Sequence, residues 1–255
     1  MILYPYVMTY NTGFAPCIYE NMLSLACCKT KLRYKIGTTI KASSEHEEHT
    51  YIMGLCGKGL LKRNQVKFGS DIEKLEYSPI YIARVTDVVS CEEYYSKKEF
   101  AKRPDCKYKY QNGHWAVKEN NPHYDGKKVE TIDFRDTIDL SYNKSEPNYV
   151  LLSDEYIYWG RNLIPFNEID DKFPTYKEIK NVFLDVRDTR RHSPRSDTYK
   201  ISKEEESIFE LFFKNYCYSH NKLKTDKEMT IDDYFIINKK CANVHCEGTE
   251  AGGNE

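Results

Sequence analysis

The chain has 255 residues with 38 Lys and Arg against 39 Asp and Glu, so its formal net charge is −1. A hydrophobic fraction of 40%, a charged fraction of 30% and a mean hydropathy of −0.71 argue against a membrane protein and against a largely disordered chain. The net charge hides an asymmetry, because residues 1–118 hold 18 basic and 12 acidic side chains, whereas residues 119–255 hold 20 and 27. A basic half is typical of a polyanion-binding face, and solvated surface is the competing explanation.

The N-terminus and the cysteines indicate a compartment. No basic segment precedes the first apolar residues, and Pro5 and Pro16 interrupt the apolar run, so we expect no secretory signal. The nine cysteines are an odd number without regular spacing, which favours reduced thiols over a disulfide framework. We therefore expect a cytoplasmic protein.

Runs of aromatic and β-branched residues predict four strands in the first half of the chain, over residues 3–10, 34–41, 50–56 and 80–89. Between them we expect a helical turn over 21–28 and a long loop over 57–78. Ser90 and Glu93 have the spacing of a capping box, which predicts a short helix over 91–102.

The second half begins with a loop-rich segment over 103–148. Strands over 149–153 and 156–159 then flank Asp154-Glu155, a plausible hairpin turn. Ser202 and Glu205 form a second capping-box pattern before a helix that ends at Tyr216. Its apolar stripe is Ile208, Leu211, Phe212 and Tyr216.

The order of these elements predicts an α+β fold, a small and mostly antiparallel β-barrel with peripheral helices. We divide the chain into a barrel domain over 1–166, a helical extension over 167–246 packed on it, and a disordered tail over 247–255.

Three segments carry a family resemblance: Tyr10-Asn11-Thr12-Gly13-Phe14-Ala15-Pro16 with Ser24 to Arg33, Ile80 to Val85 with Glu93-Tyr94-Tyr95, and Val150 to Gly160. Together they resemble the second family of nucleotide modification associated domains, over roughly residues 2–166. The resemblance implies a bacterial or phage setting linked to base modification in DNA. The strand order also resembles a PUA-like barrel, the architecture of base-reading domains. Asn11, Cys17 and Thr38 depart from the family pattern, and the loss of Asp at two of these positions implies a member that binds without reacting.

The ligand-binding candidates form two groups. Lys29, Lys31 and Arg33 alternate, so on an extended segment they share one face that suits phosphates, close to Tyr10, Asn11 and Thr12. The second group is Ser153, Asp154, Tyr156 and Tyr158. On a strand, Tyr156 and Tyr158 point to one face and Ile157 and Trp159 to the other. A base could stack on the tyrosines, and a core strand is the alternative.

Several further residues suit catalysis, polyanion binding or a metal. His123 lies in an irregular loop and suits acid–base chemistry. Basic residues interleave with aromatic ones over 97–110, as in a groove for single-stranded nucleic acid. Arg187, Arg190, Arg191 and Arg195 suggest a mobile loop that closes on a polyanion. Zinc is possible at four C-terminal residues, Cys217, His220, Cys241 and Cys246, which are equally compatible with an unligated cluster.

The chain lacks the P-loop, Rossmann, zinc-protease and α/β-hydrolase motifs, which argues against those classes. We expect a phage-defence or base-modification protein that holds a nucleotide or a nucleic-acid base in an aromatic pocket, with no membrane partner. One alternative is an enzyme acting on a base or nucleotide through Cys27, His123 or Asp154. Another is a protein-interaction component without a small ligand. The sequence does not determine the oligomeric state.

Overall fold

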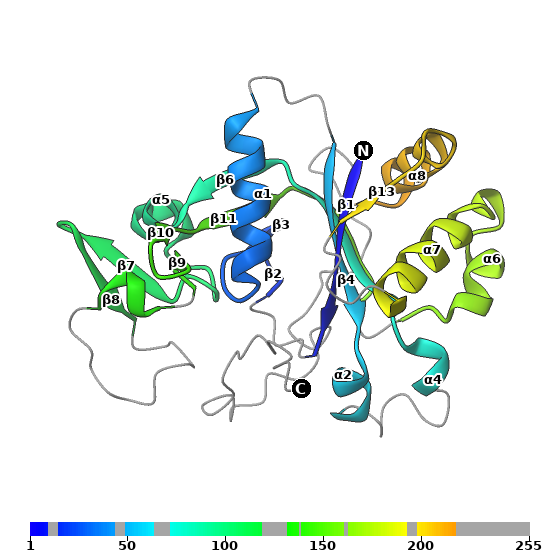
Figure 1. Ribbon diagram of the computed structural model, residues 1–255, viewed down its shortest axis with the longest axis horizontal. Coiled ribbons are helices and arrows are strands. Elements are labelled where there is room, and N and C mark those ends of the chain that lie inside the picture. Colours follow the sequence, from blue (N-terminus) through cyan, green and yellow to red (C-terminus); the bar gives the residue numbers. More distant parts are fainter. Residues whose placement is uncertain are drawn as a thin grey trace, which may run out of the picture.

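The computed structural model describes residues 1–9, 15–43, 49–63, 72–118, 132–137, 139–160, 163–192 and 198–217. In these ranges helices and antiparallel sheets occur together, which confirms the α+β class (Figure 1). None of the helices in these ranges has the length and apolarity that crossing a bilayer requires.

The largest sheet has five strands in the order β12-β5-β4-β1-β13. They are β12 (Glu155–Tyr158), β5 (Pro79–Arg84), β4 (Thr50–Cys56), β1 (Ile2–Met8) and β13 (Tyr199–Lys200). β1 and β4 run parallel, with Ile2 opposite Thr50 and Met8 opposite Cys56. Their carboxyl ends therefore meet at the same edge of the sheet.

A second sheet has four strands in the order β2-β3-β11-β6. They are β2 (Cys17–Tyr19), β3 (Met22–Leu25), β11 (Tyr149–Ser153) and β6 (Asp87–Ser90). Two small antiparallel pairs complete the described strands: β7 (Tyr108–Gln111) with β8 (His114–Val117), and β9 (Ser141–Tyr142) with β10 (Glu146–Pro147). The segment over 21–28, expected as a helical turn, contains β3, which pairs with β2 and β11.

A bent ribbon of two antiparallel chain segments joins the two large sheets. One segment contains β5 and β6, and the other contains β11 and β12. Tyr158 lies opposite Tyr81 in the first sheet, and Tyr149 lies opposite Ser90 in the second, so the antiparallel register continues unchanged across the bend. The predicted hairpin at Asp154 is wrong, because β11 pairs with β3 and β6 while β12 pairs with β5. The bend divides the strands between two open sheets. Consequently no sheet in the described ranges closes into the barrel that we expected.

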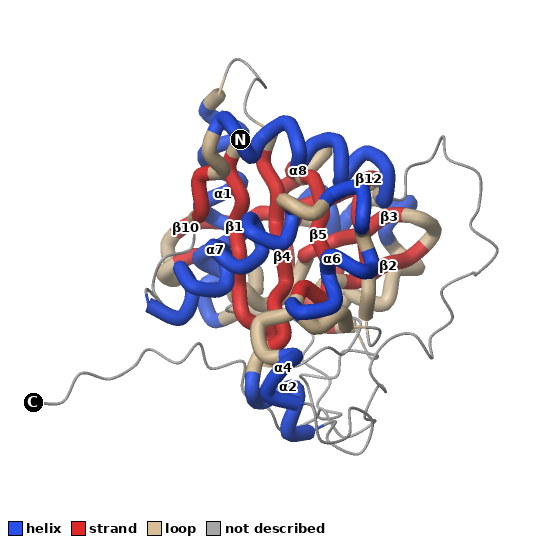
Figure 2. The backbone as a smooth tube through the Cα atoms, turned by 90° about the vertical axis from the view of Figure 1, so that its right-hand side faces the viewer, coloured by secondary structure: helices blue, strands red, loops and turns tan. Residues whose placement is uncertain are grey.

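The helices cover both faces of the five-stranded sheet, as Figures 1 and 2 show. They are α1 (Thr30–Ala42), α2 (Lys58–Arg63), α4 (Ile72–Leu75), α5 (Cys91–Ser96), α6 (Ile169–Lys172), α7 (Ile179–His192) and α8 (Lys203–Tyr216), with 3-10 turns η2 (Lys98–Phe100), η3 (Phe134–Asp136), η4 (Phe166–Glu168) and η5 (Pro174–Tyr176). Helices α6 to α8 pack on one face against side chains such as Met53 and Ile157, whereas α1 and the second sheet pack on the other against Ile52 and Tyr156. The alternation of side chains along β4 and β12 separates these two cores.

Helix α1 replaces the strand that we predicted over residues 34–41. Leu32 and Ile36 lie four residues apart on the buried face of this helix. Gly37 belongs to the same face, and a Cβ atom there would lie 2.3–2.7 Å from carbon atoms of the Tyr149 side chain. The glycine thus allows close packing of α1 against β11 and does not mark a bend in a strand.

Two helix starts are confirmed, and three other expectations are wrong in whole or in part. Ser90 and Ser202 accept hydrogen bonds from the backbone N–H groups of Glu93 and Glu205 at the starts of α5 and α8. The buried residues of α8 are Phe209, Phe212 and Phe213, and Leu211 and Tyr216 of the predicted stripe are exposed. The expected loop over 57–78 contains α2 and α4, and the arginines from Arg187 to Arg191 lie on the last turns of α7.

Candidate functional site at the carboxyl edge of the parallel strands

Two glycines of β4 and the segment after it bring the side chains at this edge into contact. A Cβ atom on Gly54 would lie 2.4 Å from the Tyr81 ring and 2.6 Å from the sulfur of Met8. A Cβ atom on Gly57 would lie 2.6 Å from Val7, and the Gly57 N–H donates to the Met8 carbonyl at 3.0 Å. Without side chains at these positions, the Tyr81 ring crosses β4 and the chain after β4 closes against the end of β1.

Lys29 lies at the end of β1, just before α1. Cys28 and Lys29 both have left-handed backbone angles, with φ of 58° and 48°, which turn the chain into the helix. The Lys29 ammonium donates to the Val7 carbonyl at 3.1 Å and lies 4.8 Å from the centre of the Tyr6 ring. The aromatic face and the carbonyl therefore fix a positive charge at this edge.

Three tyrosines continue from Lys29 across the sheet. The Tyr6 and Tyr81 hydroxyls form a hydrogen bond of 2.6 Å, and Tyr158 lies opposite Tyr81 in the register of β12 and β5. Burial raises the pKa of Tyr6 and the pKa of Tyr81 well above their ordinary range. Both phenols therefore keep their protons, and one of the two hydroxyl protons is left to donate beyond the pair. Tyr6 and Tyr81 are buried, whereas Tyr158 is half-buried.

The predicted row of three phosphate-binding side chains is wrong in its geometry. Arg33 is 0% exposed, and its guanidinium donates to the carbonyls of Cys28, Tyr149 and Asp139 at 2.6–2.8 Å. Lys31, the second residue of α1, is exposed. Side chains two residues apart share a face on a strand but point in different directions on a helix. Lys31 and Arg33 therefore do not lie on one face with Lys29. Of the three, Lys29 lies at the edge.

The second predicted group lies on the bent ribbon. The Ser153 hydroxyl donates to the Glu155 carbonyl at 2.6 Å and accepts from the Glu155 N–H at 3.2 Å, so it stabilises the bend. Asp154 is exposed at the bend. Tyr156 and Tyr158 share the face that packs on the core beneath α1, and Ile157 lies on the opposite face, as we expected from strand geometry.

Other candidates are described only in part. Cys27 is 0% exposed, and a hydrogen bond with Cys28 together with burial raises its pKa well above the ordinary value, which opposes the thiolate that a nucleophile needs. Tyr10, Asn11, Thr12, His123, His220, Cys241 and Cys246 lie outside the described residues. Cys217 is buried at the end of α8, and zinc stays a prediction. Within the described ranges no three His, Cys, Asp or Glu side chains gather as a metal ion requires.

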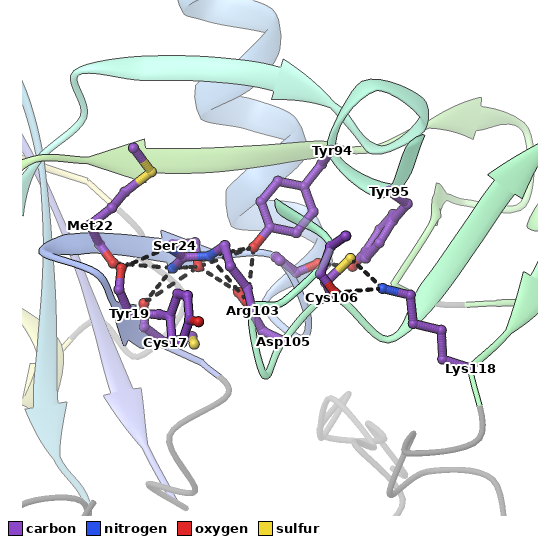
Figure 3. A network of polar contacts seen from close by, with 12 residues as sticks. Cys17, Tyr19, Met22, Ser24, Tyr94, Tyr95, Arg103, Asp105, Cys106 and Lys118 are labelled. Carbon is purple, nitrogen blue, oxygen red and sulfur yellow. Dashed lines mark hydrogen bonds and ion pairs between the residues drawn. The ribbon is translucent and has the colours of Figure 1, made fainter. Parts of the chain in front are cut away.

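The basic run over 97–110 contains a buried network that the sequence did not reveal. Arg103 donates to the hydroxyls of Ser24 and Tyr94 at 2.7 and 2.9 Å, and both of these hydroxyls bond Asp105, at 2.5 and 2.8 Å (Figure 3). Arg103 and Lys107 are 4% and 1% exposed, so neither lines the groove that we expected. The network ties the hairpin of β2 and β3 to the segment after α5.

These features define an α+β protein with aromatic and basic side chains at the shared carboxyl edge of two parallel strands. The chain belongs to the nucleotide modification associated domain 2 family, whose model matches residues 1–182. The match confirms the family resemblance and extends past residue 166 into α7, so it includes every strand of the five-stranded sheet except β13. Neither the curated proteins nor the solved structures gave a match. Membership places the chain in the setting of nucleotide modification.

Proposed function

We propose that this chain binds a nucleotide or a nucleic-acid base, plain or modified, at the edge formed by Lys29, Tyr6, Tyr81 and Tyr158. The observation that carries the proposal is the Lys29 ammonium, held between the Val7 carbonyl and the Tyr6 ring at the end of β1. The family supports a nucleotide as the ligand. Ligands of open sheets with parallel strands commonly bind outside the carboxyl ends of those strands.

Each side chain has a different task in this proposal. Lys29 supplies positive charge for a phosphate, and its contacts with the Val7 carbonyl and the Tyr6 ring orient it. The half-buried ring of Tyr158 provides a face for an unstacked base, and such stacking contributes about 1–3 kcal/mol per base. Extraction of a base from a helix costs a few kcal/mol, so stacking of this size offsets it. Tyr6 and Tyr81 are positioning residues, because their hydrogen bond fixes the ring beneath Lys29.

Binding of labelled oligonucleotides with and without modified bases, and of mononucleotides, tests the proposal. Lys29→Met should weaken binding about ten-fold or more, because a hydrogen bond to a charged group contributes about 1.5–3 kcal/mol. Lys41→Met is the matched control. Lys41 is exposed on the last turn of the same helix, about 18 Å along its axis from Lys29. The proposal fails if the two variants bind alike, or if the unmodified protein binds none of these ligands at low salt.

A further inference from the structure

A series of contacts connects Lys29 to the end of α7 along the carboxyl edge. Lys29 bonds Val7, and the next carbonyl, that of Met8, accepts from Gly57. On the far side of β4, the Tyr77 N–H donates to the Cys56 carbonyl at 2.7 Å. The guanidinium of Arg191 lies 5.5 Å from the centre of the Tyr77 ring. The edge is thus continuous from α1 to α7, two segments that are far apart in the sequence.

Exposed basic side chains accompany this edge. Lys58 follows Gly57 directly and its side chain is 74% exposed. Lys62 of α2, Lys74 of α4 and Arg191 of α7 are exposed as well. Figures 1 and 2 show α2 and α4 side by side below the ends of β1 and β4, and the last turn of α7 ends close to α4 in Figure 1. Three helices, α2, α4 and α7, therefore contribute positive charge to one side of the molecule.

Two carboxylates near this edge are already engaged. Glu76 lies 3.8 Å from the Lys58 ammonium, and its side chain is 14% exposed. Asp188 bonds the Arg187 guanidinium at 2.9 Å, and the hydrogen bond from Arg187 holds the pKa of Asp188 below its usual value. The charge of Arg191 also lowers the pKa of Asp188. The Arg191 guanidinium itself lies over the Tyr77 ring. Among the side chains that the structure describes here, the basic ones outnumber the carboxylates, so we expect a positive field at the edge.

The edge is longer than the rise between two successive phosphates of a nucleic-acid strand. From β1 across β4 to Tyr77 is two strand spacings, about 10 Å. Phosphates along one strand of a duplex rise by only about 3.4 Å each. We infer that the edge from Lys29 through Lys58 and Lys62 to Arg191 holds the backbone of a single-stranded nucleic acid, one base of which lies against Tyr158. The inference rests on the proposed function and assigns its substrate class, a polynucleotide.

Salt-dependent binding of a labelled single-stranded oligonucleotide tests the inference. The double variant Lys62→Gln/Arg191→Gln should weaken oligonucleotide binding and reduce the slope of log affinity against log salt by about 1.4, at about 0.7 for each phosphate that is no longer neutralised. The control is Lys41→Gln/Lys200→Gln, which removes the same charge from exposed positions on α1 and β13. Mononucleotide affinity should be unchanged in both double variants. Thermal melting confirms that each variant is folded.

The outcomes separate the inference from the proposed function. Weaker oligonucleotide binding and a smaller slope in the Lys62 and Arg191 variant alone support the inference. Equal slopes in both double variants overturn it, since net charge then explains the effect. If the unmodified protein binds an oligonucleotide no more tightly than a mononucleotide, the inference is wrong and the proposed function stands. If it binds neither, both are wrong.

Discussion

Replacement of Arg103 by Met removes the centre of the buried network. The guanidinium donates to three backbone carbonyls of the β2–β3 hairpin at 3.0–3.2 Å, those of Cys17, Tyr19 and Met22. It also lies 3.5 Å from the Asp105 carboxylate, which is 0% exposed. Met has a similar length and preserves much of the packing, so the main loss is electrostatic. The variant leaves a buried carboxylate without its cation.

The expected destabilisation is about 3–5 kcal/mol, the usual effect of removing one partner from a buried ion pair. Carbonyls that lose their donor add to this loss, since a buried unsatisfied group costs about 1–3 kcal/mol. The total stability of a domain is about 5–15 kcal/mol, so the change is large enough to measure and large enough to endanger folding. Arg103→Lys keeps the charge but loses the branched guanidinium that reaches several acceptors. Its stability should therefore lie between that of Arg103→Met and that of the unmodified protein.

Urea unfolding followed by circular dichroism measures these differences. Lys102→Met is the matched control, because Lys102 is exposed next to the network and its replacement should change stability by less than about 0.5 kcal/mol. If Arg103→Met is insoluble while the other two variants fold, the order of stabilities still holds. An Arg103→Met protein within about 1 kcal/mol of the unmodified one would refute the reasoning.

Two further predictions concern packing and pH. Gly37→Ala should destabilise the protein by about 1–3 kcal/mol in thermal or urea unfolding, because the new methyl group meets the Tyr149 side chain. Stabilisation, the usual effect of this change in an exposed helix, would contradict the packing. Burial raises the pKa of Cys91 to about 11, and the pKa values of Cys56 and Tyr199 to about 12. The folded state keeps these protons after the unfolded chain has lost them. Their stabilisation is therefore complete below the ordinary thiol pKa of 9.0 and is lost as the pH rises toward 12. The urea midpoint should fall steadily above pH 9, and a constant or rising midpoint would be inconsistent with this reasoning.

Elements with strong local signals could be predicted from the sequence. The strand over Thr50–Cys56 and the strand over Tyr149–Ser153 have the bounds that their apolar residues indicate. Ser90 and Ser202 begin helices because a hydroxyl three residues before a Glu caps the backbone locally. The aromatic faces of β12 followed from strand geometry alone.

Long-range contacts determine the rest, and no local pattern contains them. Residues 34–41 are rich in β-branched and aromatic side chains, yet they form α1, because Leu32 and Ile36 are buried by the second sheet. Arg33 and Arg103 resemble surface charges in the sequence. Their acceptors include Asp139 and Ser24, which lie 106 and 79 residues away. Local sequence also does not show that β11 and β12 belong to different sheets.

Photocrosslinking tests the central claim most directly. A single-stranded oligonucleotide with photoreactive uracil bases is bound to the full chain and irradiated, and the modified peptides are identified by mass spectrometry. The account predicts adducts on peptides from β12, at Tyr158, and from the segment around Lys29, with loss of the adducts in Lys29→Met. Adducts confined to residues 97–118, or adducts that are the same in Lys29→Met as in the unmodified protein, would contradict it.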